Sequence, residues 1–115
     1  MTAACRLFST FVLAVVTSGL FASPGFAQET MALQISVQNH QFRPSEIHGR
    51  ANVPIILRIK NQDGAAMEFE SVSLRVEKIV PANSEGTVRL RPLSPGRYEF
   101  FDDFHQSTRG TLIIQ

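Results

Sequence analysis

The stretch RYEFFDDFHQSTRGTLIIQ, residues 97–115, combines two strand-like runs with a polar loop between them. RYEFF (97–101) and TLIIQ (111–115) are rich in the aromatic and β-branched residues that strands favour, and together they are typical of a β-hairpin. Successive strand residues point to opposite faces, so Tyr98, Phe100 and Asp102 share one face. Because we expect the two aromatic side chains in the core, Asp102 is predicted to point inward, where a carboxylate needs a partner.

Short strand-like runs, separated by turn signals, continue through the chain upstream of this hairpin. They alternate between apolar and polar residues or are rich in Val and Ile, and both patterns indicate strands. The runs cover residues 33–39, 42–44, 47, 53–60, two pieces within 67–80, and 87–91. No window after residue 27 has apolar residues at helical spacing over the length of an ordinary helix. The pattern predicts an all-β fold, a Greek-key antiparallel β-sandwich of roughly seven to eight strands.

The first 27 residues have the pattern of a secretory signal peptide. Arg6 precedes an uncharged apolar run from Leu7 to Phe21, and small residues follow at Gly25 and Ala27. The run is short for a membrane span, and no second one follows. We therefore predict a signal peptide at residues 1–27 and a domain at 28–115. The domain is expected in the periplasm, without stable membrane insertion after cleavage.

The charge balance and the cysteine count argue against several classes of protein. Arg6 is one of the 11 basic residues, and all 10 acidic residues lie after position 27, so the mature chain is expected to be neutral. Its basic residues are scattered, which argues against nucleic-acid binding. Cys5 is the single cysteine, so residues 28–115 offer no thiolate ligand. The sequence also lacks hydrolase motifs of the Gly-x-Ser-x-Gly and His-Glu-x-x-His kinds.

Two segments of the chain hold side chains that could bind a metal ion. These candidates are Met67, Glu68, Glu70, Asp102, Asp103 and His105. Carboxylates and imidazole favour hard or borderline ions such as Fe, Mn, Zn and Cu(II), and Met adds affinity for Cu(I). Because Met67 and Glu68 lie on opposite faces of a regular strand, the six side chains cannot all bind one ion.

A structural role is open to each of these residues as well. Asp102 and Asp103 could cap a turn, because Asp readily bonds its own backbone. Met67 could fill the core, and the two glutamates could face solvent. His40 and His48 are interpreted as surface residues in turn-like segments.

The order of several segments resembles the cupredoxin family. The matching segments are HQFRPSEI (40–47), ANVPIILRIKN (51–61), MEFES (67–71), SPGRYEFF (94–101) and RGTLIIQ (109–115). The resemblance implies a Greek-key β-sandwich with a metal site at one end. Compared with a blue-copper cupredoxin, Met67 stands at the position of the first His ligand and Asp102 at that of the Cys, while His105 resembles the second His. A type 1 blue-copper site is therefore not expected.

A closer resemblance is to the small cupredoxin-like proteins of bacterial iron-uptake systems, of the EfeO-domain and FtrB types. EFES (68–71), the pair Glu77-Lys78, PGRYEFF (95–101) and RGTLII (109–114) are similar to that group. The resemblance implies a periplasmic protein that binds Fe(II), or assists its copper-dependent oxidation, before transport through an iron permease. Its cofactor would be a copper or iron ion, and its partners the periplasmic and membrane components of the permease system.

In this interpretation His105 is the anchoring nitrogen ligand, and Asp102 or Asp103 supplies a carboxylate. The two glutamates add negative charge or ligands, and Met67 contacts copper. Two other functions stay open. One is a metal-free docking module for a periplasmic partner, which an exposed apolar patch around Phe101 and Phe104 would favour. The other is a periplasmic copper-binding protein. Whether the protein is an enzyme is also left open.

Overall fold

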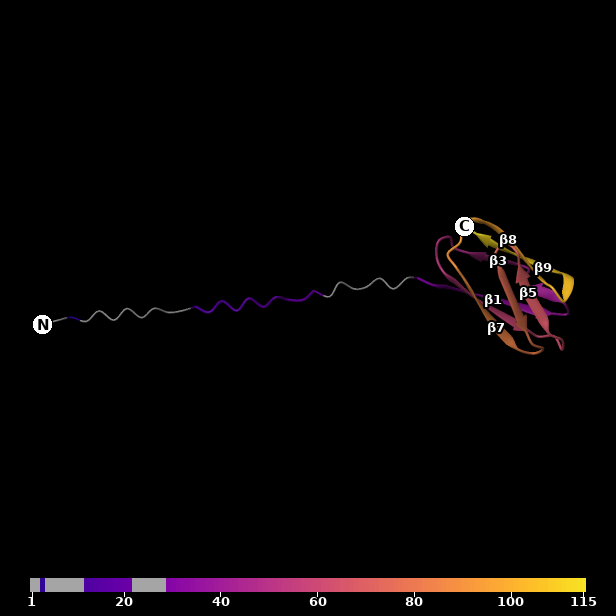
Figure 1. Ribbon diagram of the computed structural model, residues 1–115, viewed down its shortest axis with the longest axis horizontal. Helices are drawn as coiled ribbons and strands as arrows, with labels where there is room; N and C mark the ends of the chain where they lie inside the picture. Colours follow the sequence, from indigo (N-terminus) through magenta and orange to yellow (C-terminus); the bar gives the residue numbers. More distant parts are fainter. Residues whose placement is uncertain (1–2, 4–11, 22–28) are drawn as a thin grey trace.

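The computed structural model of the protein describes residues 3, 12–21 and 29–115 (Figure 1). Residues 12–21 have no regular secondary structure, and their side chains are exposed. The predicted cleavage point before Gln28 lies outside the described residues. In the described ranges, no helix has the length and apolar character needed to cross a membrane.

Within the described residues, nine strands form two sheets that pack face to face. The first sheet has the spatial order β2 (Gln41–Arg43), β1 (Met31–Gln38), β4 (Ile55–Asn61) and β7 (Glu85–Leu90). The second has the order β3 (Glu46–Gly49), β9 (His105–Ile114), β8 (Gly96–Asp102), β5 (Met67–Ser71) and β6 (Val76–Val80). The predicted all-β sandwich is confirmed, with nine strands instead of seven to eight.

The expectation of purely antiparallel pairing is wrong for two strand pairs. β1 runs parallel to β4, and β3 runs parallel to β9. Neither pair is joined by a hairpin, since β2 and β3 lie between β1 and β4 along the chain, and β4 to β8 lie between β3 and β9. A hairpin forces antiparallel pairing, but a connection that crosses to the other sheet can return in either direction. Both sheets are therefore mixed.

The last hairpin is longer and tighter than the sequence predicted. β9 begins at His105 instead of Thr111, and β8 extends to Asp102, so only Asp103 and Phe104 form the turn. Asp102 and His105 are paired across the closing end of the hairpin. Gly110 of β9 lies under the Phe100 ring, where an added Cβ would come within 2.4 Å of the ring. Because the residues just before Thr111 are mostly polar, the sequence pattern did not predict this part of the strand.

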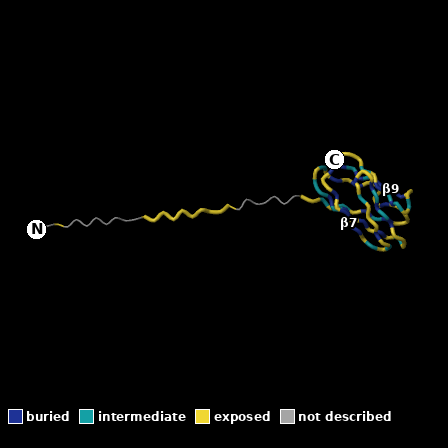
Figure 2. The backbone as a smooth tube through the Cα atoms, viewed as in Figure 1, coloured by how far each residue is buried: buried dark blue, intermediate teal, exposed yellow. Residues whose placement is uncertain are grey.

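Buried and exposed positions alternate along most strands, and the buried side chains fill the space between the sheets (Figure 2). Phe42, Phe69 and Phe100 form an aromatic cluster, with the Phe100 ring 4.9 Å from Phe42 and 5.1 Å from Phe69, centroid to centroid. Tyr98, expected in the core, is only partly buried and packs against it. The cluster supports one end of the sandwich, because Phe69 is paired with Asp102 and Phe42 follows the β1–β2 turn.

Candidate metal centre

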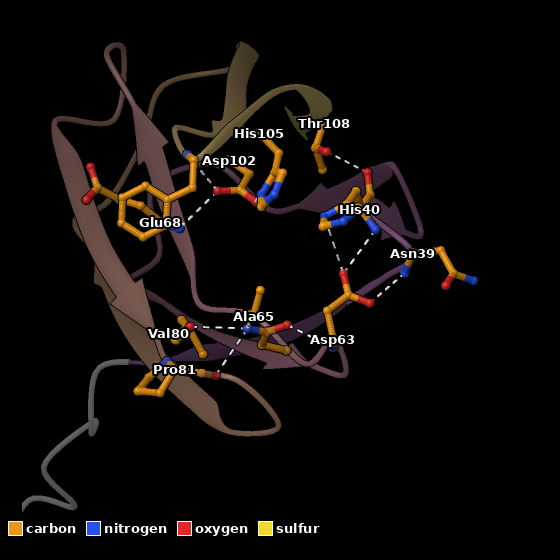
Figure 3. Close-up of polar contacts among 12 residues, drawn as sticks. Asn39, His40, Asp63, Ala65, Glu68, Val80, Pro81, Asp102, His105 and Thr108 are labelled. Carbon is orange, nitrogen blue, oxygen red and sulfur yellow. Dashed lines mark hydrogen bonds and ion pairs between the residues drawn. The ribbon is translucent and has the colours of Figure 1, made fainter.

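Three connecting segments meet at this end of the sandwich (Figure 3). They are the β1–β2 turn at Asn39 and His40, the β4–β5 loop around Asp63, and the β8–β9 turn that precedes His105. Their polar side chains come within contact distance of one another, although they are far apart in the sequence. We call this group the loop end.

Asp102 points inward, as predicted, and its side chain is only 1% exposed. Its Oδ1 accepts hydrogen bonds from the backbone N–H of Glu68 and of Phe104, each at 3.0 Å. Its Oδ2 lies 3.0 Å from Nδ1 of His105. The bond from Phe104 is a turn cap of the kind that Asp commonly makes. Both oxygens of this buried carboxylate are therefore engaged, and the partner that burial requires is His105.

His105 is held in one orientation by this contact. A carboxylate only accepts hydrogen bonds, so Nδ1 of His105 is the donor in this contact, and Nε2 is the ring nitrogen left to offer a lone pair to a metal ion. The side chain remains 35% exposed. This is the arrangement in which a carboxylate fixes the tautomer of a metal-binding histidine.

His40 is exposed, as predicted for a surface residue, with 52% of its side chain accessible, and it also belongs to the loop end. Its ring lies against that of His105, with the centroids 4.0 Å apart and the planes tilted by 32°. The Asp63 carboxylate accepts hydrogen bonds from the backbone N–H of Asn39 at 2.7 Å and of His40 at 3.0 Å. The pKa of Asp63 lies below its usual value, chiefly because the carboxylate accepts the hydrogen bond from the His40 backbone. Burial of the carboxylate opposes part of this effect.

Glu68, Glu70 and Asp103 form a separate group on the outer face of the second sheet, which we call the acidic triad. Each offers a carboxylate oxygen, and the three oxygens lie within 4.8 Å of one another. Partial burial, followed by the neighbouring carboxylates of Asp103 and Glu77, raises the pKa of both glutamates. The Glu68 side chain extends away from the two imidazoles (Figure 3).

The six predicted ligands are thus divided among three places. Asp102 and His105 lie at the loop end, the acidic triad lies outside the sheet, and Met67 is a core residue with 1% exposure. The structural role considered for Met67 is the one observed. As predicted from strand alternation, the six side chains do not surround one point.

An apolar side chain also lies beside the loop end. Phe104 is 48% exposed, while Phe101 is partly buried under the Arg109 guanidinium, 5.4 Å from the ring centroid. The apolar patch that a docking module would need is therefore limited here to Phe104.

The donor set does not fit a type 1 blue-copper site. Such a site is built around a Cys thiolate, and the single cysteine of the sequence is Cys5. The residue two positions after Phe100 is Asp102, whose oxygens already accept three hydrogen bonds. Imidazole nitrogen and carboxylate oxygen instead fit a borderline or hard ion such as Cu(II) or Fe(II).

Fold and site together define a two-sheet β-sandwich with imidazole and carboxylate groups gathered at one end. The chain belongs to the Cupredoxin-like domain family, whose model matches residues 10–114. A relative is an uncharacterized protein of Rickettsia prowazekii (strain Madrid E), 39% identical over 84 residues, or 73% of this chain and 67% of that protein.

Solved structures share the fold at low sequence identity. The metal binding domain of the Streptococcus pneumoniae D39 Cu(I)-exporting P-type ATPase CopA, with Cu(I), has a TM-score of 0.66 and 14% identity, over 77% of this chain and 98% of that domain. A copper binding protein in its apo form has a TM-score of 0.67 and 17% identity, over 75% of this chain and 88% of that one. A reduced amicyanin variant has a TM-score of 0.58 and 14% identity, over 73% and 82%. The resemblance to cupredoxins is confirmed for the family, and the likeness to the iron-uptake group stays a prediction.

Proposed function

We propose that this protein is an exported metal-binding protein of ferrous-iron uptake, which holds a copper or ferrous ion at the loop end. The observation that carries the proposal is the contact between the buried Asp102 carboxylate and Nδ1 of His105. It leaves Nε2 of a partly exposed imidazole free to coordinate, with its orientation already set. Two proteins that share the fold are named for copper, one a metal binding domain with Cu(I) and one a copper binding protein, and this supports copper as the bound ion.

Each predicted site residue has a role in the proposal. His105 is the anchoring ligand, and Asp102 orients it and increases its basicity. The acidic triad supplies negative charge close to the loop end, which concentrates cations around it. Met67 supports the site from the core, because its side chain is buried.

The physiological setting rests on the sequence resemblance. The segments EFES (68–71), PGRYEFF (95–101) and RGTLII (109–114) support a place beside an iron permease. In the periplasm the protein would pass Fe(II) to the permease components, or assist copper-dependent oxidation of the iron before transport. A carboxylate and imidazole site suits this task better than a thiolate site, because Fe(II) prefers harder ligands.

The proposal is tested by titrating the purified protein, free of any polyhistidine tag, with Cu(II), Fe(II) and Mn(II) under matched conditions. We expect a site of micromolar affinity or tighter, and a loss of at least about tenfold in His105→Ala. His105→Asn is the companion variant, because its amide can still donate a hydrogen bond to Asp102. His48→Ala is the matched control, since His48 is exposed and contacts only Glu46 among the ion pairs of the described residues.

The result that overturns the proposal is wild-type protein that binds none of the three ions, or binds them with unchanged affinity when His105 is replaced. The metal-free docking module would then be favoured, with Phe104 as the first residue to replace. Ion preference separates the two forms of the proposal. Tight Cu(II) binding supports copper as a cofactor, and Fe(II) binding supports iron as the cargo.

A further inference from the structure

The structure assigns a second imidazole ligand to the loop end: we propose that His40 and His105 together bind one borderline divalent ion of the Cu(II) class. This inference rests on the proposed function and adds a ligand that comes from a different hairpin. Its starting observation is the 4.0 Å separation of the two ring centroids. Two imidazoles in contact, at a partly exposed site, can supply nitrogen donors to the same ion.

The backbone of His40 lies in the left-handed region, which is uncommon for residues other than glycine. Asn39 and His40 form a two-residue hairpin turn with φ values of 52° and 55°. Gly is strongly preferred at the second position of such a turn, because other residues are strained at positive φ. Strain of this kind is concentrated at functional sites, where the surrounding structure maintains it. Positive φ also occurs at Asn52, Arg75 and Asn83. The case for His40 as a ligand therefore rests on its position against the His105 ring.

Other segments hold His40 in position. The Asp63 carboxylate accepts the hydrogen bond from its backbone N–H at 3.0 Å, and Thr108 Oγ1 of β9 donates a hydrogen bond to its carbonyl oxygen at 2.5 Å. Asp63 is only 15% exposed and Thr108 is buried. These contacts tie the β1–β2 turn to the β4–β5 loop and to the strand that begins with His105 (Figure 3). The fold thus holds the backbone of His40 beside β9, and the imidazole, whose side chain is 52% exposed, lies against the His105 ring.

The charges around the pair suit a cation. Asp102 lies 3.0 Å from His105 Nδ1, and Asp63 Oδ2 lies 3.8 Å from His40 Nδ1. Only the contact of His105 with Asp102 is a hydrogen bond of the kind that orients a histidine ligand and increases its basicity, whereas Asp63 places a negative charge near the His40 ring. Two imidazoles select borderline ions, above all Cu(II), over hard ions such as Mg²⁺ and Mn²⁺. Coordination positions of the ion that the two histidines do not fill would remain open to water or to a group from a partner protein.

His40→Gly is the decisive variant, because glycine is favoured at positive φ and the change should preserve the turn. The experiment compares Cu(II) affinity and pulsed EPR spectra of wild type, His40→Gly, His105→Asn and the control His48→Ala. We expect at least about tenfold weaker Cu(II) binding in His40→Gly and in His105→Asn. The EPR spectra should report two coordinated imidazoles in wild type and one in either variant. Amide NMR spectra of each variant establish that the sandwich is intact.

The outcomes distinguish this inference from the proposed function. If His105→Asn loses Cu(II) while His40→Gly keeps wild-type affinity and the wild-type imidazole count, the second ligand is overturned and the proposed function survives. Weaker binding in His40→Gly with an unchanged imidazole count also overturns it, because His40 would then act only on the shape of the turn. If wild type binds no ion, both proposals fail. A loss of one imidazole in each variant, with none in His48→Ala, supports the pair.

Discussion

Two histidine–carboxylate pairs in this molecule have nearly the same geometry and very different surroundings. His105 Nδ1 lies 3.0 Å from Asp102, and His48 Nε2 lies 3.1 Å from Glu46. The Asp102 side chain is 1% exposed, whereas that of Glu46 is 53% exposed. The first pair closes the β8–β9 hairpin at the loop end, and the second lies on the surface of β3.

The difference shows that the distance between the two charged groups does not by itself measure how much the pair contributes to stability. An exposed pair exchanges water contacts for a screened attraction and contributes about 0–1 kcal/mol. A buried carboxylate has lost its water, so its hydrogen bonds and its partner must all be present. The buried pair can therefore fix a ligand in one orientation, while the exposed pair remains free to rearrange.

Breaking the buried pair should have the largest effect on stability. Asp102→Ala leaves the N–H groups of Glu68 and Phe104 and the His105 ring without their acceptor. We expect the free energy of unfolding to fall by about 3 kcal/mol, measured by urea denaturation. The matched change Glu46→Ala should fall within about 0.5 kcal/mol of wild type. Equal losses in the two variants would contradict the contrast between the pairs.

Removing only the charge of Asp102 tests its role in orienting the ligand. Asp102→Asn keeps an oxygen that can accept the two backbone hydrogen bonds, but it no longer presents a carboxylate to His105. We expect about tenfold weaker Cu(II) binding, with a smaller loss of stability than in Asp102→Ala. Calorimetric titration beside urea denaturation measures both. Unchanged affinity would mean that His105 does not need the charge.

Thr108→Val tests whether the loop end is held together as a unit. The variant keeps the shape of the buried side chain and removes the hydrogen bond to the His40 carbonyl. We expect a loss of about 1 kcal/mol in the free energy of unfolding. The NMR signals of His40 should also shift, while those of His48 should stay in place. A shift at His48 of the same size would indicate a general change of the sheet.

The smallest expected effect belongs to the exposed pair. Glu46→Gln should change the free energy of unfolding by less than about 0.5 kcal/mol at low salt, and by less still at high salt, because the pair is screened. Denaturation curves at two ionic strengths measure this. A clear loss of stability that persists in high salt would show that exposure does not predict how much such a pair contributes to the free energy of unfolding.

Much of the fold followed from local patterns. Alternation predicted that Asp102 points inward and that Met67 and Glu68 point to opposite faces, and both are observed. The start of β9 was missed, because Gln106 to Arg109 are polar and resemble a loop. That His40 lies at the loop end was not predicted, for a different reason. The available signal was an Asn-His pair at a hairpin turn where Asn-Gly is the ordinary choice.

Side-chain alternation and residue identity are local properties, so they were enough to indicate the all-β class and to exclude a thiolate ligand from residues 28–115. Three other features come from tertiary contacts: the parallel pairing of two strand pairs, the position of His40 against His105, and the division of the six candidate ligands among three places. Those features depend on which segments are brought together when both sheets bury their apolar faces. No short window of sequence contains that information, since the contacts at the loop end join residues from three separate connections.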